Sequence, residues 1–168
     1  MSILCSMDPG SSGAFVKIST NFPFELIDII DYPKLENEPA PASYITQGIL
    51  NTGKLEVFLR DVDYFLTEKP FVLNKDYPTT AARYAFYYAS VISIIHFLKI
   101  PIQYILPKTW QGSYGIKVKE ESMKLVQEMS QVKEILNINP STRIRHDVCD
   151  AVLIAMYGAK NVNKLFKN

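Results

Sequence analysis

The sequence predicts a single α/β domain in which a mixed five-stranded sheet is flanked by helices. Five short apolar runs have the length of strands, and they alternate with longer segments of helical periodicity. The chain has 168 residues, 48% of them hydrophobic, so one domain over residues 1–168 has enough apolar side chains for a core. We find no internal repeat and no low-complexity segment.

Three strands are expected in the first 31 residues, and they should form a meander. The segment Asp8 to Gly13 has the composition of a tight turn, which joins the first two strands as a hairpin. Segment 32–43 contains three prolines and is expected to be a mobile loop without regular structure. The expected strands are Ile3–Met7, Ala14–Ile18 and Glu25–Asp31.

The rest of the chain alternates between helices and two further strands. A helix is expected over part of residues 44–63, where the pattern is mixed. Thr79 and Thr80 can cap the next helix, which runs to about Lys99. Pro107 should stop the last strand. The remaining elements are strands Asp63–Thr67 and Ile102–Leu106 and helices from Lys119 to about Leu136 and from about Arg145 to Phe166.

Several classes of protein are excluded by composition. The longest apolar stretch, Tyr84–Leu98, is shorter than the roughly 18 residues of a membrane span, so we expect a buried helix there. The first 24 residues lack the pattern of a secretory or transit segment. Cys5 and Cys149 are too far apart in sequence to form a metal knuckle, and free thiols in a reducing intracellular setting are expected.

The net charge is only +1, but the charges are unevenly distributed. Residues 1–76 hold six Lys or Arg against eleven Asp or Glu, a net charge of −5, whereas residues 77–168 hold twelve against six, a net charge of +6. A basic half beside a group of carboxylates suits a polyanion such as nucleic acid. A basic surface that only faces solvent has the same composition, so charge leaves both interpretations open.

Four carboxylates occupy positions that suit a divalent cation. Asp8 follows the first strand, Glu68 follows the fourth, and Asp147 and Asp150 begin the last helix. The two helical acids share one face, about 5–6 Å apart at Cβ, and repel each other unless a cation intervenes. Oxygen-only ligands favour Mg²⁺ or Mn²⁺. Taken singly, Asp8 also suits an ordinary Asp-Pro-Gly turn, and Glu68 also suits a solvated strand end.

This arrangement resembles the RuvC-type Holliday-junction resolvases, a family with a ribonuclease-H-like fold. The resemblance rests on a strand ending in Asp8-Pro9-Gly10, a second strand delivering Glu68, and Asp-x-x-Asp-Ala followed by Leu-Ile-Ala in segment 147–155. It covers most of the chain. Segments 106–110 and 146–158 look most like the phage and chloroplast branches. The fold implied is a ribonuclease-H-like mixed five-stranded sheet flanked by helices.

The resemblance implies a homodimeric, metal-dependent endonuclease that resolves four-way (Holliday) junctions and other branched DNA by paired nicks. The implied ends are 5′-phosphate and 3′-hydroxyl, and the implied roles are DNA recombination and repair. Two divalent ions per active site, Mg²⁺ or Mn²⁺, would be held by Asp8, Glu68, Asp147 and Asp150. Neither association with a membrane nor a small-molecule cofactor is expected. Likeness to phage enzymes implies the cytoplasm of an infected host as the location, with an organelle as the less favoured alternative.

Further residues are candidates for contact with DNA or for support of the acids, and the resemblance bears on Phe71, Lys108 and Lys119 among them. Phe71 follows Glu68 by three residues, as does the aromatic residue that RuvC enzymes insert at the junction centre, although a Phe beside a strand end also suits the core. His146 can orient water or phosphate, or cap the helix. Trp110, the sole tryptophan, should pack beneath the DNA-binding loop. Candidate phosphate contacts, which equally suit a solvated surface, are Lys108, Lys117, Lys119, Arg143 and Arg145.

Two features depart from the family. Bacterial RuvC has glycines in the helix after its catalytic Glu, a helix that often forms the dimer interface, whereas segment 83–88 here has none. Segment 32–43 has no counterpart. Dimer geometry and substrate range are therefore open. A non-catalytic junction-binding protein of the same fold remains an alternative, whereas 168 residues leave no room for the two lobes of an actin-like phosphotransferase.

Overall fold

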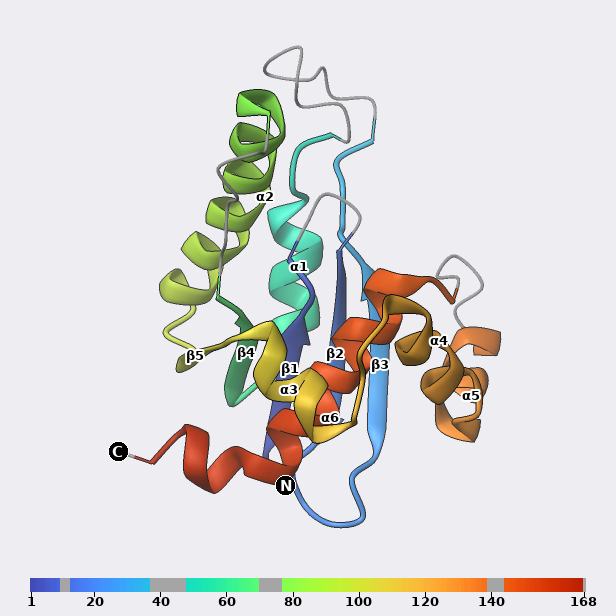
Figure 1. Cartoon of the computed structure of the whole chain (residues 1–168). Helices are drawn as coiled ribbons and strands as arrows, with labels where there is room; N and C mark the ends of the chain where they lie inside the picture. The colour runs from blue at the N-terminus through green and yellow to red at the C-terminus, as the bar shows by residue number, and fades with distance from the viewer. Residues whose placement is uncertain (10–12, 37–47, 70–76, 139–143, 168) are drawn as a thin grey trace.

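The computed structural model describes residues 1–9, 13–36, 48–69, 77–138 and 144–167. Within these residues, five strands form one mixed sheet in the order β3-β2-β1-β4-β5 (Figure 1). β2 pairs antiparallel with both β1 and β3. β4 pairs parallel with both β1 and β5. The strands are β1 (Ile3–Met7), β2 (Ala14–Ser19), β3 (Leu26–Asp31), β4 (Tyr64–Glu68) and β5 (Ile102–Ile105).

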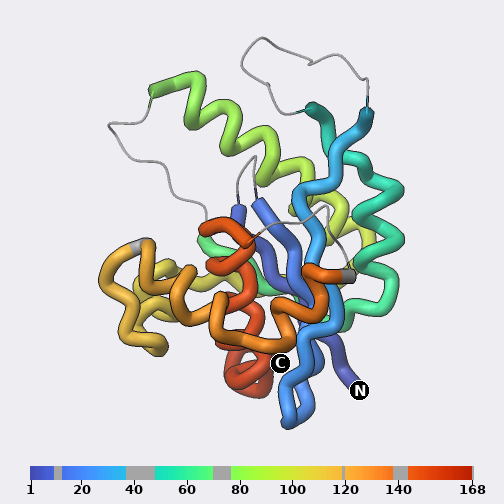
Figure 2. Tube along the Cα trace, turned by 90° about the vertical axis from the view of Figure 1, so that its right-hand side faces the viewer, coloured from blue at the N-terminus to red at the C-terminus, as the bar shows by residue number. Residues whose placement is uncertain are grey.

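Helices cover both faces of the sheet, so each face has its own hydrophobic core. α1 and α2 pack on one face, and α6 with the helices beside it packs on the other, as Figures 1 and 2 show. The predicted class, a mixed five-stranded sheet flanked by helices, is confirmed. The helices are α1 (Thr52–Leu59), α2 (Pro78–Phe97), α3 (Pro107–Ser113), α4 (Lys119–Gln127), α5 (Ser130–Ile138) and α6 (His146–Leu165).

The central strands are apolar on both sides because both sides are covered. Along β1, Leu4 points into the core beneath α6, whereas Cys5 and Met7 point into the core beneath α1 and α2. Lys17 in β2 is the charged exception and is buried. Its Nζ lies 2.8 Å from Asp61 Oδ1 and 4.8 Å from the ring centroid of Phe58, so its charge is compensated.

α6 is the helix that lies closest to the sheet. Nine of its side chains or glycines are buried, in agreement with the apolar segment that predicted it. The hydroxyl of Ser6 donates a hydrogen bond of 2.6 Å to the carbonyl of Ala151, which ties the first turns of α6 to β1. Farther along, a Cβ at Gly158 would lie only 2.6 Å from Leu66 Cδ2 and 2.9 Å from Leu4 Cδ1. The helix therefore rests directly on two strands.

Two expectations about helix boundaries were wrong, and one helix was not expected. Thr79 and Thr80 lie inside α2 rather than capping it, because Pro78 already occupies the first turn after N-cap Tyr77. Pro107 stops β5 but also begins the unpredicted helix α3, since its fixed φ suits a first helical turn. The single helix expected from Lys119 to Leu136 is divided into α4 and α5.

The division of α4 from α5 follows from what each helix packs against. α4 contacts α6, whereas α5 contacts β3. The side-chain Oε1 of Gln131 at the start of α5 accepts a hydrogen bond of 3.0 Å from the backbone N–H of Leu26. One straight helix cannot reach both partners, so the chain turns between Glu128 and Ser130.

α2 is only partly buried, unlike the expectation for its apolar segment. Tyr87, Val91 and Ile95 form its buried stripe, whereas Phe97 is 79% exposed. In the described parts of the chain, no helix is long and apolar enough to cross a membrane. Lys34, in the expected proline-rich loop 32–43, forms an isolated antiparallel bridge with Leu50, and residues 37–43 of that loop lie outside the described residues.

Gly158→Ala should lower the free energy of unfolding by about 1 kcal/mol. The added methyl must displace two fully buried leucine side chains, an overpacking cost of about 1–3 kcal/mol, which exceeds the gain of about 1 kcal/mol in helix propensity. Urea denaturation measures the change. Gly112→Ala in α3 is the matched control, because a Cβ there meets nothing within 4 Å. Its stability should be unchanged or higher, and equal stability of the two variants would contradict the close approach at Gly158.

Candidate functional site

Asp8 and Glu68 are brought together by the parallel pairing of β1 and β4. Met7 is the register partner of Thr67, so the next residue on each strand, Asp8 and Glu68, lies at the same edge of the sheet. Neighbouring strands are about 4.8 Å apart. The hydroxyl of Thr67 donates a hydrogen bond of 3.2 Å to the carbonyl of Met7, which supports this register at its last step. The two strand ends therefore present two carboxylates side by side.

Asp147 and Asp150 come from the first two turns of α6. Cys149 between them is fully buried, whereas both acids are only partly buried. The hydrogen bond from Ser6 to Ala151 holds this part of α6 beside β1, one residue before the strand ends at Met7. Burial and the negative charges of Asp150 and Asp147 raise the pKa of Cys149 to about 12. The thiol is thus a protonated core group.

Glu68 is the carboxylate whose surroundings are most clearly defined. Burial raises its pKa, the hydrogen bond from Trp110 lowers it, and the negative charge of Asp150 raises it again. The indole Nε1–H of Trp110 donates to Glu68 Oε1 over 2.6 Å. The effect of Asp150 means that α6 and β4 place negative charge close together. Trp110 is packed in the core, and its position beneath a DNA-binding loop remains a prediction. Its contact with Glu68 was not expected.

Tyr84 belongs to the same region, although the sequence did not indicate it. Burial raises the pKa of its hydroxyl, and the negative charges of Glu68 and Asp8 raise it further. Its ring stacks on Tyr88 one turn later, with centroids 6.0 Å apart. Tyr84 reaches the strand ends because α2 crosses that edge of the sheet, which is a tertiary arrangement without a local sequence signal. The phenol of Tyr84 thus lies within electrostatic reach of two of the candidate carboxylates.

Arg145 connects the start of α6 to the end of β3. Its Nη1 lies 2.9 Å from Asp31 Oδ1, and its Nε lies 3.5 Å from Asp147 Oδ2. The side chains are 31%, 38% and 25% exposed for Arg145, Asp31 and Asp147, so the ion pairs are only partly screened by water. Asp147 therefore has a cationic partner within the chain. That Arg145 contacts phosphate remains a prediction, and in the structure its guanidinium pairs with these two acids.

His146 begins α6 and is partly buried. Its Nδ1 is shielded from solvent and has no hydrogen-bond partner among the described atoms. The N-cap position is occupied by Arg145, which makes no side-chain cap bond. His146 is thus the first residue of the helix rather than its cap. Its role beside the acids remains a prediction.

Of the candidate basic residues, Lys117 shares a hollow with Asp150, and Lys108 lies on the same helix as Trp110. Lys108 is exposed in the first turn of α3, two residues before Trp110. Lys117 is exposed and lines a hollow of about 230 Å³ that Asp150 also lines. Lys119 is the first residue of α4, and its side chain lies outside the described structure. Phe71 and Arg143 also lie outside the described residues, so the structure does not test them.

The donor chemistry fits a hard divalent cation, although no closed metal site is formed. Among the described side chains, no group of three or more His, Cys, Asp or Glu could hold a metal ion. Asp8, Glu68 and Asp150 are nevertheless oxygen ligands, and the charge of Asp150 acts unfavourably on ionised Glu68. A cation would relieve that repulsion. The residues therefore fit Mg²⁺ or Mn²⁺ by ligand type and by charge.

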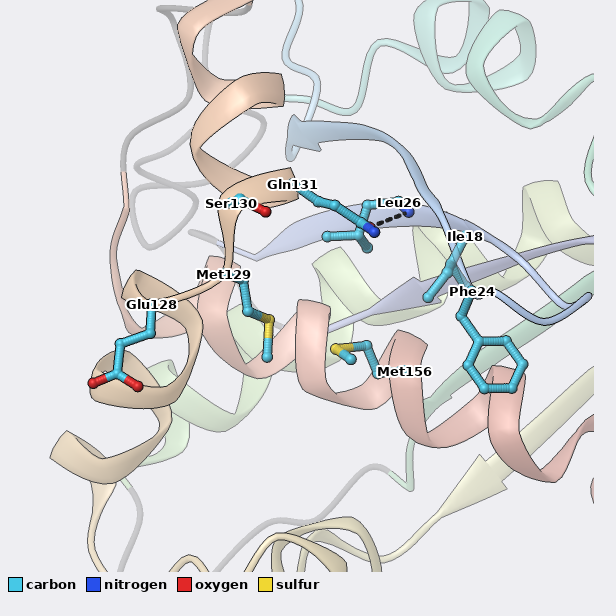
Figure 3. A pocket seen from close by; sticks show the side chains of 8 residues that line it. All are labelled: Ile18, Phe24, Leu26, Glu128, Met129, Ser130, Gln131 and Met156. Carbon is cyan, nitrogen blue, oxygen red and sulfur yellow. Dashed lines mark hydrogen bonds between the residues drawn. The ribbon is translucent and has the colours of Figure 1, made fainter.

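A separate hollow of about 310 Å³ lies between the sheet and the junction of α4 with α5 (Figure 3). Ile18, Met129 and Met156 give it an apolar lining, and the Gln131 to Leu26 hydrogen bond crosses its side (Figure 3). None of the four candidate carboxylates lines it. This hollow is not part of the candidate site.

Comparison with known proteins identifies similar folds but no related sequence. No protein-family model and no curated protein matches the chain. RuvC of Thermus thermophilus in complex with a Holliday junction substrate has a TM-score of 0.63 and 15% identity, covering 96% of this chain and 95% of that one. Another T. thermophilus RuvC structure has a TM-score of 0.59, 16% identity, and coverage of 96% and 95%.

The yeast mitochondrial Holliday junction resolvase Ydc2 is also similar, with a TM-score of 0.58 and 16% identity over 92% of this chain and 77% of that one. At these identities the comparison concerns the fold. The chain therefore has a RuvC-like, ribonuclease-H-like fold, as predicted. Likeness to the phage or chloroplast branch in particular remains a prediction.

Proposed function

We propose that this protein is a metal-dependent endonuclease that resolves four-way DNA junctions and cuts other branched DNA. The observation that carries the proposal is the meeting of Asp8 and Glu68 at adjoining strand ends, with Asp150 of α6 close enough to raise the pKa of Glu68. The fold supports the proposal, because one similar structure is RuvC in complex with a Holliday junction substrate and another is named a Holliday junction resolvase.

Two ions, Mg²⁺ or Mn²⁺, would be held by Asp8, Glu68 and Asp150. Asp147 would become a further ligand if its ion pair with Arg145 opened. When bound, such ions activate an attacking water and stabilise the departing 3′-oxygen, which gives 5′-phosphate and 3′-hydroxyl ends. The chain contributes rigid placement, because its acids lie on strand ends and on one helix.

Lys108 and Lys117 would hold the DNA backbone beside these acids. Both are exposed, and Lys117 shares a hollow with Asp150, so a phosphate bound by the lysine would lie near the carboxylates. Backbone contacts of this kind position a duplex without reading its sequence. Tyr84 would border the same space, because its phenol lies within electrostatic reach of Asp8 and Glu68.

Asp8→Asn and Glu68→Gln should each slow cleavage of a synthetic four-way junction by at least about 100-fold in Mg²⁺ or Mn²⁺. Loss of a hydrogen-bonding partner of a metal ligand costs about 10–100-fold, and loss of a ligand itself should cost more. The matched control is Glu25→Gln, an exposed acid that immediately precedes β3 at the other end of the sheet. Gel analysis of labelled strands measures the rates. Cleavage by both acid variants at the parental rate would refute the assignment.

Lys117→Ala and Lys108→Ala should each weaken junction binding and reduce the slope of log K against log salt by about 1, because one phosphate contact is lost. Binding is measured by fluorescence anisotropy in a Glu68→Gln background, so that cleavage does not interfere. Lys54→Ala, an exposed lysine of α1, is the control and should leave the slope unchanged. A slope that is the same for all three variants would contradict the placement of DNA over the carboxylates.

We also propose that the protein acts as a homodimer, since two sites about a two-fold axis suit paired nicks in a symmetric junction. The exposed side of α2, which includes Ala89, is the surface proposed for the contact. Light scattering should give twice the chain mass of 19.1 kDa, and Ala89→Glu should shift it toward the monomer. Val57→Glu, at an exposed apolar position of α1, should not. A monomer for the parental protein would contradict the proposal.

A second candidate is a non-catalytic protein that binds branched DNA. The observation that favours it is the ion pair of Asp147 with Arg145, together with the absence of a ready metal cluster among the described side chains. Junction binding without cleavage of any branched substrate in Mg²⁺ or Mn²⁺ would favour this candidate over the nuclease.

A further inference from the structure

We propose that Trp110 is a positioning residue that holds the carboxylate of Glu68 in the orientation needed to bind a divalent cation. The inference rests on the proposed function, because that function assigns Glu68 to the metal site. It concerns an indole in the core rather than any residue expected to touch DNA or metal.

The hydrogen bond itself is short and well shielded. Trp110 is 1% exposed, and its Nε1–H donates to Glu68 Oε1 over 2.6 Å, below the range of about 2.7–3.2 Å usual for N–H to O bonds. Bonds to an ionised acceptor are shorter and stronger than neutral ones, and low solvent access strengthens them further. Glu68 is therefore held by a donor that water does not readily replace.

The chemistry of the two groups suits orientation rather than neutralisation. An indole carries one N–H donor, so it can fix one carboxylate oxygen without adding charge. A carboxylate has two oxygens with about four acceptor positions, so this bond leaves capacity for a cation. A lysine or arginine in place of Trp110 would instead compete with the metal. Arg145 beside Asp147 is an example of such a competing cation in this chain.

The position of Trp110 is set by the local structure of α3. Pro107 starts this helix directly after β5, the parallel neighbour of β4, so residue 110 arrives beside Glu68. The hydroxyl of Ser113 donates 2.7 Å to the carbonyl of Trp110, and the indole belongs to the same hydrophobic cluster as Val148 of α6. The ring is thus held by packing within this cluster.

The test is Mn²⁺ binding to the protein alone, measured by electron paramagnetic resonance of free Mn²⁺. The proteins are the parent, Trp110→Phe, Glu68→Gln and the double variant. Trp110→Phe should raise the Mn²⁺ dissociation constant about 10–100-fold, as is usual for loss of a partner of a metal ligand. In the Glu68→Gln background the same substitution should cause no further change, because the two residues act through one interaction.

Two controls separate positioning from loss of packing. Replacing Trp110 by β-(3-benzothienyl)alanine keeps the shape of the ring but puts sulfur in place of the N–H, so it should weaken Mn²⁺ binding as Trp110→Phe does and also serves if that variant does not fold. Leu55→Ala removes a fully buried side chain from the opposite face of the sheet and should leave Mn²⁺ affinity unchanged when measured below its melting temperature.

The outcomes distinguish this inference from the proposed function. Parental Mn²⁺ affinity in both residue-110 variants overturns the positioning role, even if the protein cleaves junctions. An equal loss on Trp110 substitution with and without Glu68 also overturns it. Weaker binding that depends on Glu68, in a protein that cuts no branched DNA, supports the positioning role and refutes the nuclease. Absence of Mn²⁺ binding to the parent overturns both.

Discussion

The packing of α6 against β1 and β4 is the constraint on which the candidate site depends. Gly158 lets the helix lie against Leu4 and Leu66, and the hydrogen bond from Ser6 to the Ala151 carbonyl fixes its first turns. Because a helix of 20 residues is a rod about 30 Å long, fixing it at these two places also fixes Asp147 and Asp150. The acids of the helix and the acids of the strands thereby share one edge of the sheet.

Gathering negative charge at one edge is unfavourable, and the structure offsets this differently for different acids. Glu68 receives the indole N–H of Trp110, a neutral donor that supports its charged form. Asp147 is paired with Arg145, which also binds Asp31 at the end of β3. The carboxylates are therefore not equivalent. Glu68 keeps capacity for a cation, whereas Asp147 would have to exchange one positive partner for another.

Sequence patterns predicted the strands well because most strand residues are buried on both sides and so form continuous apolar runs. Sequence patterns failed at helix ends, where one short segment can suit either the end of one element or the start of another. Pro107 could have ended a strand or begun a helix, and it does both. The amphipathic pattern from residue 119 to 136 continues through Met129, yet α4 packs on α6 and α5 on β3, and only that pair of partners divides the helix.

The sequence by itself determined the class of fold and the residue types that carry chemistry, since strand length, helix periodicity and carboxylates at element ends are local properties. Asp8 and Glu68 were found in this way. The tertiary structure decided which groups act on them. Trp110 of α3 donates to Glu68, and Tyr84 of α2 lies within electrostatic reach of Glu68 and Asp8, although neither is close to these acids in sequence. Hydrogen bonds and electrostatic forces act over a few ångströms of space, and distance along the chain does not reveal that proximity.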